Sequence, residues 1–424
     1  MKPVLKLLGI AGLSGGASFL LPAYFLAAAP AQEASPAKPI AAPALSDIQF
    51  NPFKPGEADF VISNIAWALG PDADKSDACG SGMTELASDI YQKSPDGKRH
   101  DGEKDDDYAR RIRTATAPAP GVPNACQFPV ERGPDPNYRT VTARDVAVFG
   151  VDLDGQDSRA KGRPARGTCA HDDFQGIDGG HGIDNQFYRA VGCTRGFQST
   201  GSKIPFATEM LTGSWGILVT VKGIDSLTRD DDVEVGIYAN ADPIQLSAAR
   251  KPLSHATYAI DPDPRFQART HGRIVNGVLT TDPVTVRFHS VTNSMMIERP
   301  MEDARLRMTF ARDGSMEGLL AGYTDVDELF DYLVAYRKAL DMKGKPAATR
   351  RIIQTADGSS ASAGLTCNGL YHAFRQLADG HRDPKTGQCS ALSTQYRVWA
   401  IPAFVAEKPG KAVAAAGPVP TGAM

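Results

Sequence analysis

The feature that most constrains this fold is a series of short alternating stretches between residues 212 and 323. Apolar side chains recur there at every second position, which places them on one face of an extended strand. Asn276-Gly277 separates two of the stretches, and this dipeptide favours the tight turn of a β-hairpin. The stretches cover 217–221, 233–237, 273–275, 278–280, 284–288 and 306–310. Short strands at this spacing predict an antiparallel β-sandwich or jelly-roll-like domain over 201–323.

Composition agrees with a β-rich chain that carries some helices. The 424 residues include 41 glycines and 30 prolines, and 8% are aromatic, a balance typical of loop-rich β proteins. A helical repeat of apolar residues predicts a helix over 83–91. Another is predicted from a capping box at Asp325 and Glu328 to Gly344. We therefore expect a mainly β fold with appended helices, α+β overall. Further elements are expected at 370–377 (helix) and 396–405 (strand).

The densest chemistry lies between Val146 and Cys193, where seven aspartates are interspersed with glycines. Carboxylates this close in sequence repel one another unless a cation, an arginine or water offsets their charge. A bound hard cation such as calcium is the interpretation that best accounts for them. The seven are Asp152, Asp154, Asp157, Asp172, Asp173, Asp178 and Asp184.

The first part of this window predicts a strand over 146–154 that ends in a calcium-type turn. Asp152 and Asp154 fall on one face of that strand, and Gly155 permits a tight turn that brings Asp157 toward them. The turn is similar to DxDGxD calcium loops. It is not an EF-hand, because its sixth position is Asp157 rather than glycine. An ordinary Asp-Gly surface turn is the alternative.

The second part is a glycine-rich loop that needs something to order it. A cation shared with the first turn would do so, and Asn185 and Gln186 could add amide oxygens. A short amphipathic helix is expected directly afterwards, over 187–191. The cofactor predicted here is a structural Ca²⁺, held by Asp152, Asp154, Asp157, Asp178 and Asp184.

Two histidines flank the same loop, and two further aspartates lie near the C-terminal end. His171 and His181 could ligate a transition metal or act as general bases. Their spacing matches no recognised metal-ligand pattern, so exposed loop histidines are expected. Asp379 and Asp383 could hold a second cation, although a solvated turn is the simpler interpretation.

Cysteine usage indicates an oxidising compartment. Six cysteines make an even number, which in an exported chain predicts three disulfides with 15 possible connectivities. Pairing in sequence order is expected, because each bond then closes a local segment. A zinc site is the alternative, but the chain has no C-x-x-C pair. The cysteines are Cys79, Cys126, Cys169, Cys193, Cys367 and Cys389.

The N-terminus predicts export. Lys2 and Lys6 precede an apolar stretch that ends in small residues, so a signal peptide over 1–31 is expected, with an uncleaved anchor as the alternative. Removing the two lysines changes the formal charge from −3 to −5. This mild balance argues against a nucleic-acid partner. We expect a periplasmic or secreted protein with no membrane span after cleavage.

The remaining chain divides by composition into six segments. Ala/Pro-rich stretches predict a flexible leader and a disordered tail. The expected segments are a leader (32–46), a small mixed module (47–113), the calcium-binding segment (125–200), the sandwich (201–323), a helical segment that packs on it (324–405) and a tail (406–424).

Three parts of the chain together carry a family resemblance. The segment WALG at 67–70, the DLDG turn at 152–155 and the run GIDNQFYRAVGC at 182–193 resemble uncharacterised exported proteins of proteobacteria. The resemblance covers roughly the first half of the chain. It implies that the protein is exported and that the aspartate window forms one unit. It implies no catalytic residue.

These observations predict a calcium-stabilised binding protein of the bacterial envelope that recognises a glycan or a protein partner. Trp215, Tyr238 and Tyr258 could form a sugar-stacking platform, although half-buried strand aromatics are expected. One alternative is an envelope or polysaccharide hydrolase that uses paired carboxylates. Another is a structural accessory subunit of an envelope complex. The short sequence motifs of hydrolases and nucleotide-binding enzymes are not found, so whether the chain is an enzyme stays open.

Overall fold

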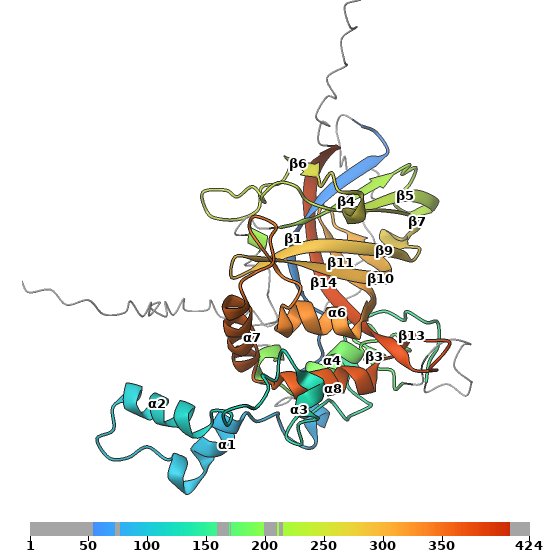
Figure 1. Cartoon of the computed structure of the whole chain (residues 1–424). Coiled ribbons are helices and arrows are strands. Elements are labelled where there is room, and N and C mark those ends of the chain that lie inside the picture. Colours follow the sequence, from blue (N-terminus) through green and yellow to red (C-terminus); the bar gives the residue numbers. More distant parts are fainter. Residues whose placement is uncertain are drawn as a thin grey trace, which may run out of the picture. The chain divides into compact units, whose positions relative to one another are not determined.

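Antiparallel strands form most of the structure (Figure 1), a computed structural model that describes residues 54–72, 77–158, 169, 171–198, 210–211 and 215–407. The main strands are hydrogen-bonded edge to edge, and the last of them also pairs with the first, so the sheet closes on itself. In order around this ring they are β1 (Glu57–Trp67), β4 (Ile217–Lys222), β5 (Arg229–Ala239), β7 (Gln267–Val275), β8 (Val278–Thr281), β10 (Met295–Phe310), β11 (Met316–Asp325) and β14 (Cys389–Glu407).

The predicted class, mainly antiparallel β with appended helices, is confirmed. Within that class the strands form one closed sheet instead of two facing sheets. The closure depends on β1, where Val61 lies opposite Leu218 of β4 on one side and Ile401 of β14 on the other. Segments predicted as separate modules therefore supply neighbouring strands, and the described residues all fall in one compact unit.

Strand β10 belongs partly to the ring and partly to a hairpin outside it. Residues 305–310 pair with β8 and β11, whereas 295–301 pair with β9 (Val284–Thr292). The register shifts between these two halves, and Asp303 has a φ of 49°. Such a bulge increases the local twist, so the hairpin departs from the ring. The remaining strands are β2 (Ala147–Val148), β3 (Gln175–Gly176), β6 (Ala256–Ile260), β12 (Leu340–Asp341) and β13 (Gly380–Arg382).

Alternate residues of the ring strands fill its interior. Phe60 of β1 and Phe310 of β10 lie with their ring centroids 6.1 Å apart, and Leu306 and Met308 are also buried. Burial of each such side chain contributes roughly 1.5–3 kcal/mol. The three aromatic residues predicted as half-buried, Trp215, Tyr238 and Tyr258, are all buried, so they offer no platform for a ligand.

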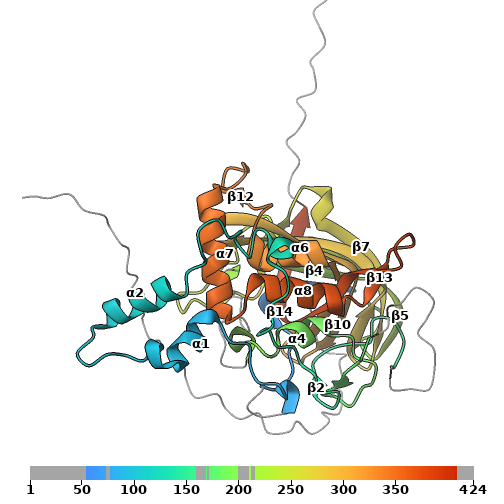
Figure 2. The same ribbon diagram turned by 60° about the horizontal axis from the view of Figure 1, so that its bottom comes forward.

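The helices α4, α6, α7 and α8 lie together beside one end of the ring (Figures 1 and 2). Helix α8 (Cys367–Leu377) packs against α3, α4 and α6, and α4 packs on β14. The others are α1 (Ala87–Lys93), α2 (Asp105–Ala115), α3 (Pro129–Arg132), α4 (Gln186–Val191), α6 (Val326–Phe330) and α7 (Thr349–Ala363), with 3-10 turns at Asp77–Cys79, Pro95–Gly97, Arg195–Phe197 and Pro264–Phe266 and a π turn at Asp331–Ala335. Among the described residues, none of these helices has the length and apolar character needed to cross a membrane.

The helix predicted from Asp325 starts as expected but ends early. The carboxylate of Asp325 accepts hydrogen bonds from the backbone of residues 327 and 328, as an N-cap does. Further on, the carboxylate of Asp331 accepts the backbone N–H groups of Arg337 and Lys338 at 2.9 and 3.0 Å. The chain therefore turns at Tyr336, which has a left-handed conformation, and the predicted end at Gly344 is wrong.

The helices predicted at 187–191 and 370–377 are confirmed as α4 and α8, whereas the one predicted at 83–91 begins only at Ala87. Helix α7 was not predicted, since its sequence is rich in serine and threonine and contains Gly358. Its buried side chains, including Ile352 and Ala356, dock it against the π turn. Tertiary packing therefore makes this helix despite weak local preference.

All six cysteines form disulfides, but the predicted pairing in sequence order is wrong. The bonds join Cys79 to Cys193, Cys126 to Cys367 and Cys169 to Cys389, over sequence separations of 114, 241 and 220 residues. The sheet and helices bring these distant segments together, and local spacing carries no information about that. Loops this long contribute about 5 kcal/mol each in the chain-entropy model.

The strand predicted over 146–154 is also largely wrong, because only Ala147–Val148 pairs with another strand. Beyond it, the side chain of Gln395 takes the place of a neighbouring strand. Its Oε1 accepts from the backbone N–H of Val151 at 2.8 Å, and its Nε2 donates to the Val151 carbonyl at 3.0 Å. These side-chain bonds hold 151–155 as an extended loop.

The predicted signal peptide (1–31) and leader (32–46) lie outside the described residues, as does the predicted tail beyond Glu407. Ala406 and Glu407, placed in that tail by composition, are the last residues of β14.

Candidate metal centre

The aspartate window converges on one fully buried carboxylate, that of Asp184. Its position is set from both sides in sequence, since Ile183 forms a β-bridge with Phe174 and Asn185 caps helix α4. Oδ2 of Asp184 accepts the backbone N–H groups of Leu153 and Asp154 at 2.6 and 3.2 Å. The two predicted halves of the window therefore meet at this side chain.

His171 is the residue that the sequence interpretation placed wrongly, because it lies in the centre of this cluster with its side chain only 9% exposed. Its Nδ1 lies 2.6 Å from the Cys169 carbonyl oxygen, and its Nε2 lies 2.7 Å from Asp184 Oδ1 and 2.8 Å from Asp173 Oδ1. A carbonyl only accepts, so Nδ1 carries a proton. Nε2 must then either carry a second proton or point its lone pair at a cation.

Asp154 completes a group of three donors suited to a metal ion. One ligand atom each from Asp154, His171 and Asp184 lies within 4.8 Å of the other two. A ligating histidine usually donates its second ring N–H to a carbonyl or carboxylate, as Nδ1 of His171 does here.

Asp379 is a second buried carboxylate that interacts with the cluster. Its side chain is 1% exposed, and Oδ1 accepts the backbone N–H of Ser393 at 2.7 Å. Oδ2 is buried and has no hydrogen-bond partner among the described residues. Burial raises the pKa of Asp379 to about 7, an effect opposed by His171 and increased by Asp184. The neighbouring Asp383 lies in an exposed turn instead, where it accepts backbone N–H groups.

The cluster as a whole holds more negative than positive charge. Burial raises the pKa of Asp152 to about 6, and the charges of Asp184, Asp154 and Asp173 add to this. Burial also raises the pKa of Asp184. For His171, burial lowers the pKa, but its hydrogen bonds to Asp173 and Asp184 outweigh that effect and raise the pKa to about 11. Without a metal ion, a single imidazolium would therefore face several carboxylates.

Backbone geometry and a disulfide hold the two halves of the window together. Gly182 has a φ of 68°, and a Cβ at that position would lie 2.3 Å from the Gln156 carbonyl oxygen. Only glycine fits this close approach. The disulfide from Cys169 to Cys389 attaches the segment just before His171 to the first residue of β14.

The five predicted ligands have different fates. Asp154 and Asp184 belong to the donor group. Asp152 lies close enough that the charges of both raise its pKa. Asp178 lies apart, where it is half-exposed and paired with Arg307 at 3.1 Å. Asp157 is not part of the donor group found among the described residues.

The sequence named His171, Asp173 and Asp379 as candidates but left all three out of the predicted ligand set. The run His171-Asp172-Asp173 was a usable signal, because it places an imidazole directly beside two carboxylates. Asp379 had no local signal, since its burial follows from the pairing of β13 with β14.

A cavity of about 360 Å³ opens beside the cluster. His171 lines it together with Gln186 and Arg189 of α4 and Gln376 of α8. His171 thus borders this cavity, while its Nε2 faces the buried carboxylates of Asp173 and Asp184.

Searches against family models, curated proteins and solved structures returned no match for this chain.

Proposed function

We propose that this chain is an exported binding protein stabilised by a divalent metal ion, with Asp154, His171 and Asp184 as ligands. The observation that carries the proposal is the orientation of His171, whose Nδ1 is held by a carbonyl while Nε2 faces two carboxylates at 2.7 and 2.8 Å. Adjacent ligands around an ion bound at about 2.0–2.1 Å lie about 3 Å apart. Nε2 of His171 and Oδ1 of Asp184 already lie near this separation, and the ligand atom of Asp154 lies within 4.8 Å of both residues' ligand atoms.

The donor set also bears on which metal is bound. Calcium, which the carboxylates alone predict, prefers oxygen ligands. An imidazole nitrogen suits zinc and other first-row metals, and carboxylates suit manganese as well. We propose zinc or manganese ahead of calcium, with a structural role in ordering the loop from Asp152 to Asp184.

The competing account is that His171 is simply a buried imidazolium. Metal analysis of the purified full chain, followed by thermal unfolding with EDTA and with zinc, manganese or calcium restored, separates the two. We expect about one metal ion per chain and a lower melting temperature in EDTA. Asp154→Ala should abolish both effects, and Asp178→Ala, from the same loop, should abolish neither. A chain without metal that gains no stability from any of the three ions would refute the metal site.

Export is supported by the three disulfides, which form and persist in oxidising compartments. A glycan or an envelope protein remains the proposed partner.

A second candidate, a metal-dependent hydrolase, is favoured by one observation. His171 lines the cavity of about 360 Å³, and a solvent-accessible ion can lower the pKa of a bound water. Hydrolysis of nitrophenyl esters, phosphates and glycosides by the metal-loaded chain, lost in Asp154→Ala, would support it. Equal rates for the two proteins would refute it.

A further inference from the structure

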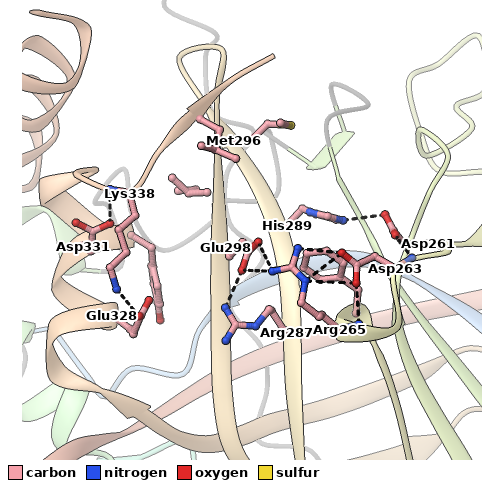
Figure 3. A pocket seen from close by; sticks show the side chains of 14 residues that line it. Asp261, Asp263, Arg265, Arg287, His289, Met296, Glu298, Glu328, Asp331 and Lys338 are labelled. Carbon is pink, nitrogen blue, oxygen red and sulfur yellow. Dashed lines mark hydrogen bonds and ion pairs between the residues drawn. The ribbon is translucent and has the colours of Figure 1, made fainter. Parts of the chain in front are cut away.

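A larger cavity, of about 530 Å³, lies apart from the metal cluster (Figure 3). Its walls come from three places in the sequence. They are the turn between β6 and β7 with Asp263 and Arg265, the hairpin of β9 and β10 with Arg287 and Glu298, and the chain after α6 with Lys338. The volume falls in the range of small-molecule sites, about 300–1,000 Å³.

Glu298 lies at the centre of a network of paired charges on one wall. Its carboxylate accepts from Arg265 Nη1 at 3.1 Å and from Arg287 Nη1 at 2.7 Å. Arg265 Nη2 also donates to Asp263 at 2.9 Å. Figure 3 shows Glu298 between the two guanidinium groups. The side chains of Arg287 and Glu298 are 35% and 34% exposed, so a ligand in the cavity can reach them.

The other charged side chains of the cavity are paired in the same way. His289 Nε2 lies 2.9 Å from Asp261 Oδ2. On the opposite wall Lys338 pairs with Glu328. Asp331 accepts from Arg337 Nε at 3.0 Å. A charged ligand would therefore have to compete with the partners that these groups already have.

A neutral ligand with several hydroxyl groups has no such difficulty. Carboxylate oxygens have about four acceptor positions per group, and each guanidinium has five N–H donors, so both retain hydrogen-bonding capacity after pairing. Hydrogen bonds to charged groups are stronger than those between neutral groups. Paired carboxylates and guanidiniums can thus bind vicinal hydroxyls, donating to some and accepting from others.

The cavity also has an apolar side. Met296, Ile297 and Leu340 line it together with the rings of Phe266 and Tyr332. Leu340 is 37% exposed. A sugar ring likewise has polar edges and an apolar C–H face, so both sides of the cavity find a match.

Two local features of the fold shape this cavity. The bulge in β10 carries the hairpin of β9 and β10 out of the ring, and Asp331 ends the helical segment so that Lys338 faces the opening. The first feature interrupts a strand and the second ends a helical segment. Irregularities of this kind are common at binding sites.

We propose that this cavity binds a neutral saccharide of one or two rings, with Glu298, Arg287 and His289 as hydrogen-bonding partners. The inference deepens the proposed binding function and rests on it, but it is independent of the metal ion.

Saturation-transfer NMR on the full chain tests this, with glucose, galactose, mannose, N-acetylglucosamine, maltose and cellobiose as neutral probes and inorganic phosphate and succinate as charged ones. We expect at least one neutral sugar to bind. Glu298→Gln should weaken it about tenfold, since one charged hydrogen-bond acceptor is lost. The control Glu234→Gln removes a glutamate of β5 that also pairs with an arginine, Arg269, and should bind as the unaltered protein does.

Three outcomes would overturn the saccharide site, namely no binding by any neutral probe, binding of only phosphate or succinate, or unchanged affinity in Glu298→Gln. Asp154→Ala keeps the two proposals apart. If this variant still binds sugar, the cavity acts without the metal site. If it loses metal but binds sugar unchanged, the loss bears on the metal proposal alone.

Discussion

The proposed metal site and the proposed saccharide cavity contain similar side chains in different electrostatic states. Around Asp184 and Asp379 the carboxylates are buried and outnumber the one histidine among them, so their pKa values rise. Around Glu298 the charged groups are partly exposed and each carboxylate has a cationic or backbone partner. The number of acidic residues therefore does not identify an ion site. What distinguishes the first region is the burial of its carboxylates around one histidine, which is why we propose an ion there.

The largest expected difference between the two regions is in stability. Asp184→Ala removes the acceptor for two backbone N–H groups and one partner of His171, so we expect a loss of about 3–5 kcal/mol in urea unfolding. Asp178→Ala, from the same loop but half-exposed, should lose under about 1 kcal/mol. If Asp184→Ala does not fold, Asp184→Asn serves in its place. Equal losses at both positions would contradict the picture of a buried anchor.

The pH dependence should separate metal-free from metal-bound protein. Asp152 and Asp379 have folded-state pKa values of about 6 and 7, above their ordinary value of 3.8. Their favourable contribution is complete below about pH 4 and is lost as the pH rises through these values. In EDTA we expect the protein to lose about 2–4 kcal/mol between pH 5 and 8.

Metal reverses this trend, because binding requires deprotonated ligands. Melting temperatures measured from pH 5 to 8, with EDTA and with metal, test both statements. Asp379→Asn should flatten the profile in EDTA. A metal-free protein that becomes more stable toward pH 8 would contradict the charge excess.

The close approach at Gly182 gives a smaller effect with a matched control. Gly182→Ala combines a φ of 68° with a Cβ 2.3 Å from the Gln156 carbonyl oxygen, so we expect about 1–3 kcal/mol of destabilisation and weaker metal binding. Gly155→Ala has a similar φ of 75° with no atom within 4 Å. It should show the strain of the backbone alone, about 1 kcal/mol. Identical losses would mean that the loops do not meet there.

The smallest effect is expected in the cavity. A double-mutant cycle with Arg287→Ala and Glu298→Ala should give a coupling energy below about 1 kcal/mol, since both side chains are partly exposed. Urea unfolding of the four proteins measures it. A coupling energy above about 2 kcal/mol would mean that this pair behaves as a buried pair does, and would contradict the difference drawn between the two regions.

Local patterns in the sequence predicted much of the fold. Alternation predicted the strands, and Asn276-Gly277 predicted the hairpin of β7 and β8, where both residues have positive φ. Turn and cap preferences act through neighbouring backbone atoms, so they can be recognised within a few residues. Of the five aspartates predicted as ligands, Asp154 and Asp184 lie together with His171, and the metal ion itself stays a prediction.

Contacts between distant segments were decided only in the tertiary structure. The pairing of β1 with β14, the partners of the six cysteines and the burial of His171 and Asp379 all join residues that no local pattern relates. A histidine in a polar loop has the same local sequence whether it is solvated or enclosed. The sequence by itself determined the alternating strands between 217 and 310, the Asn276-Gly277 turn and the acidic composition of the window. The packing of the window against β14 decided which of its charged groups are buried, because desolvation depends on everything packed around a group.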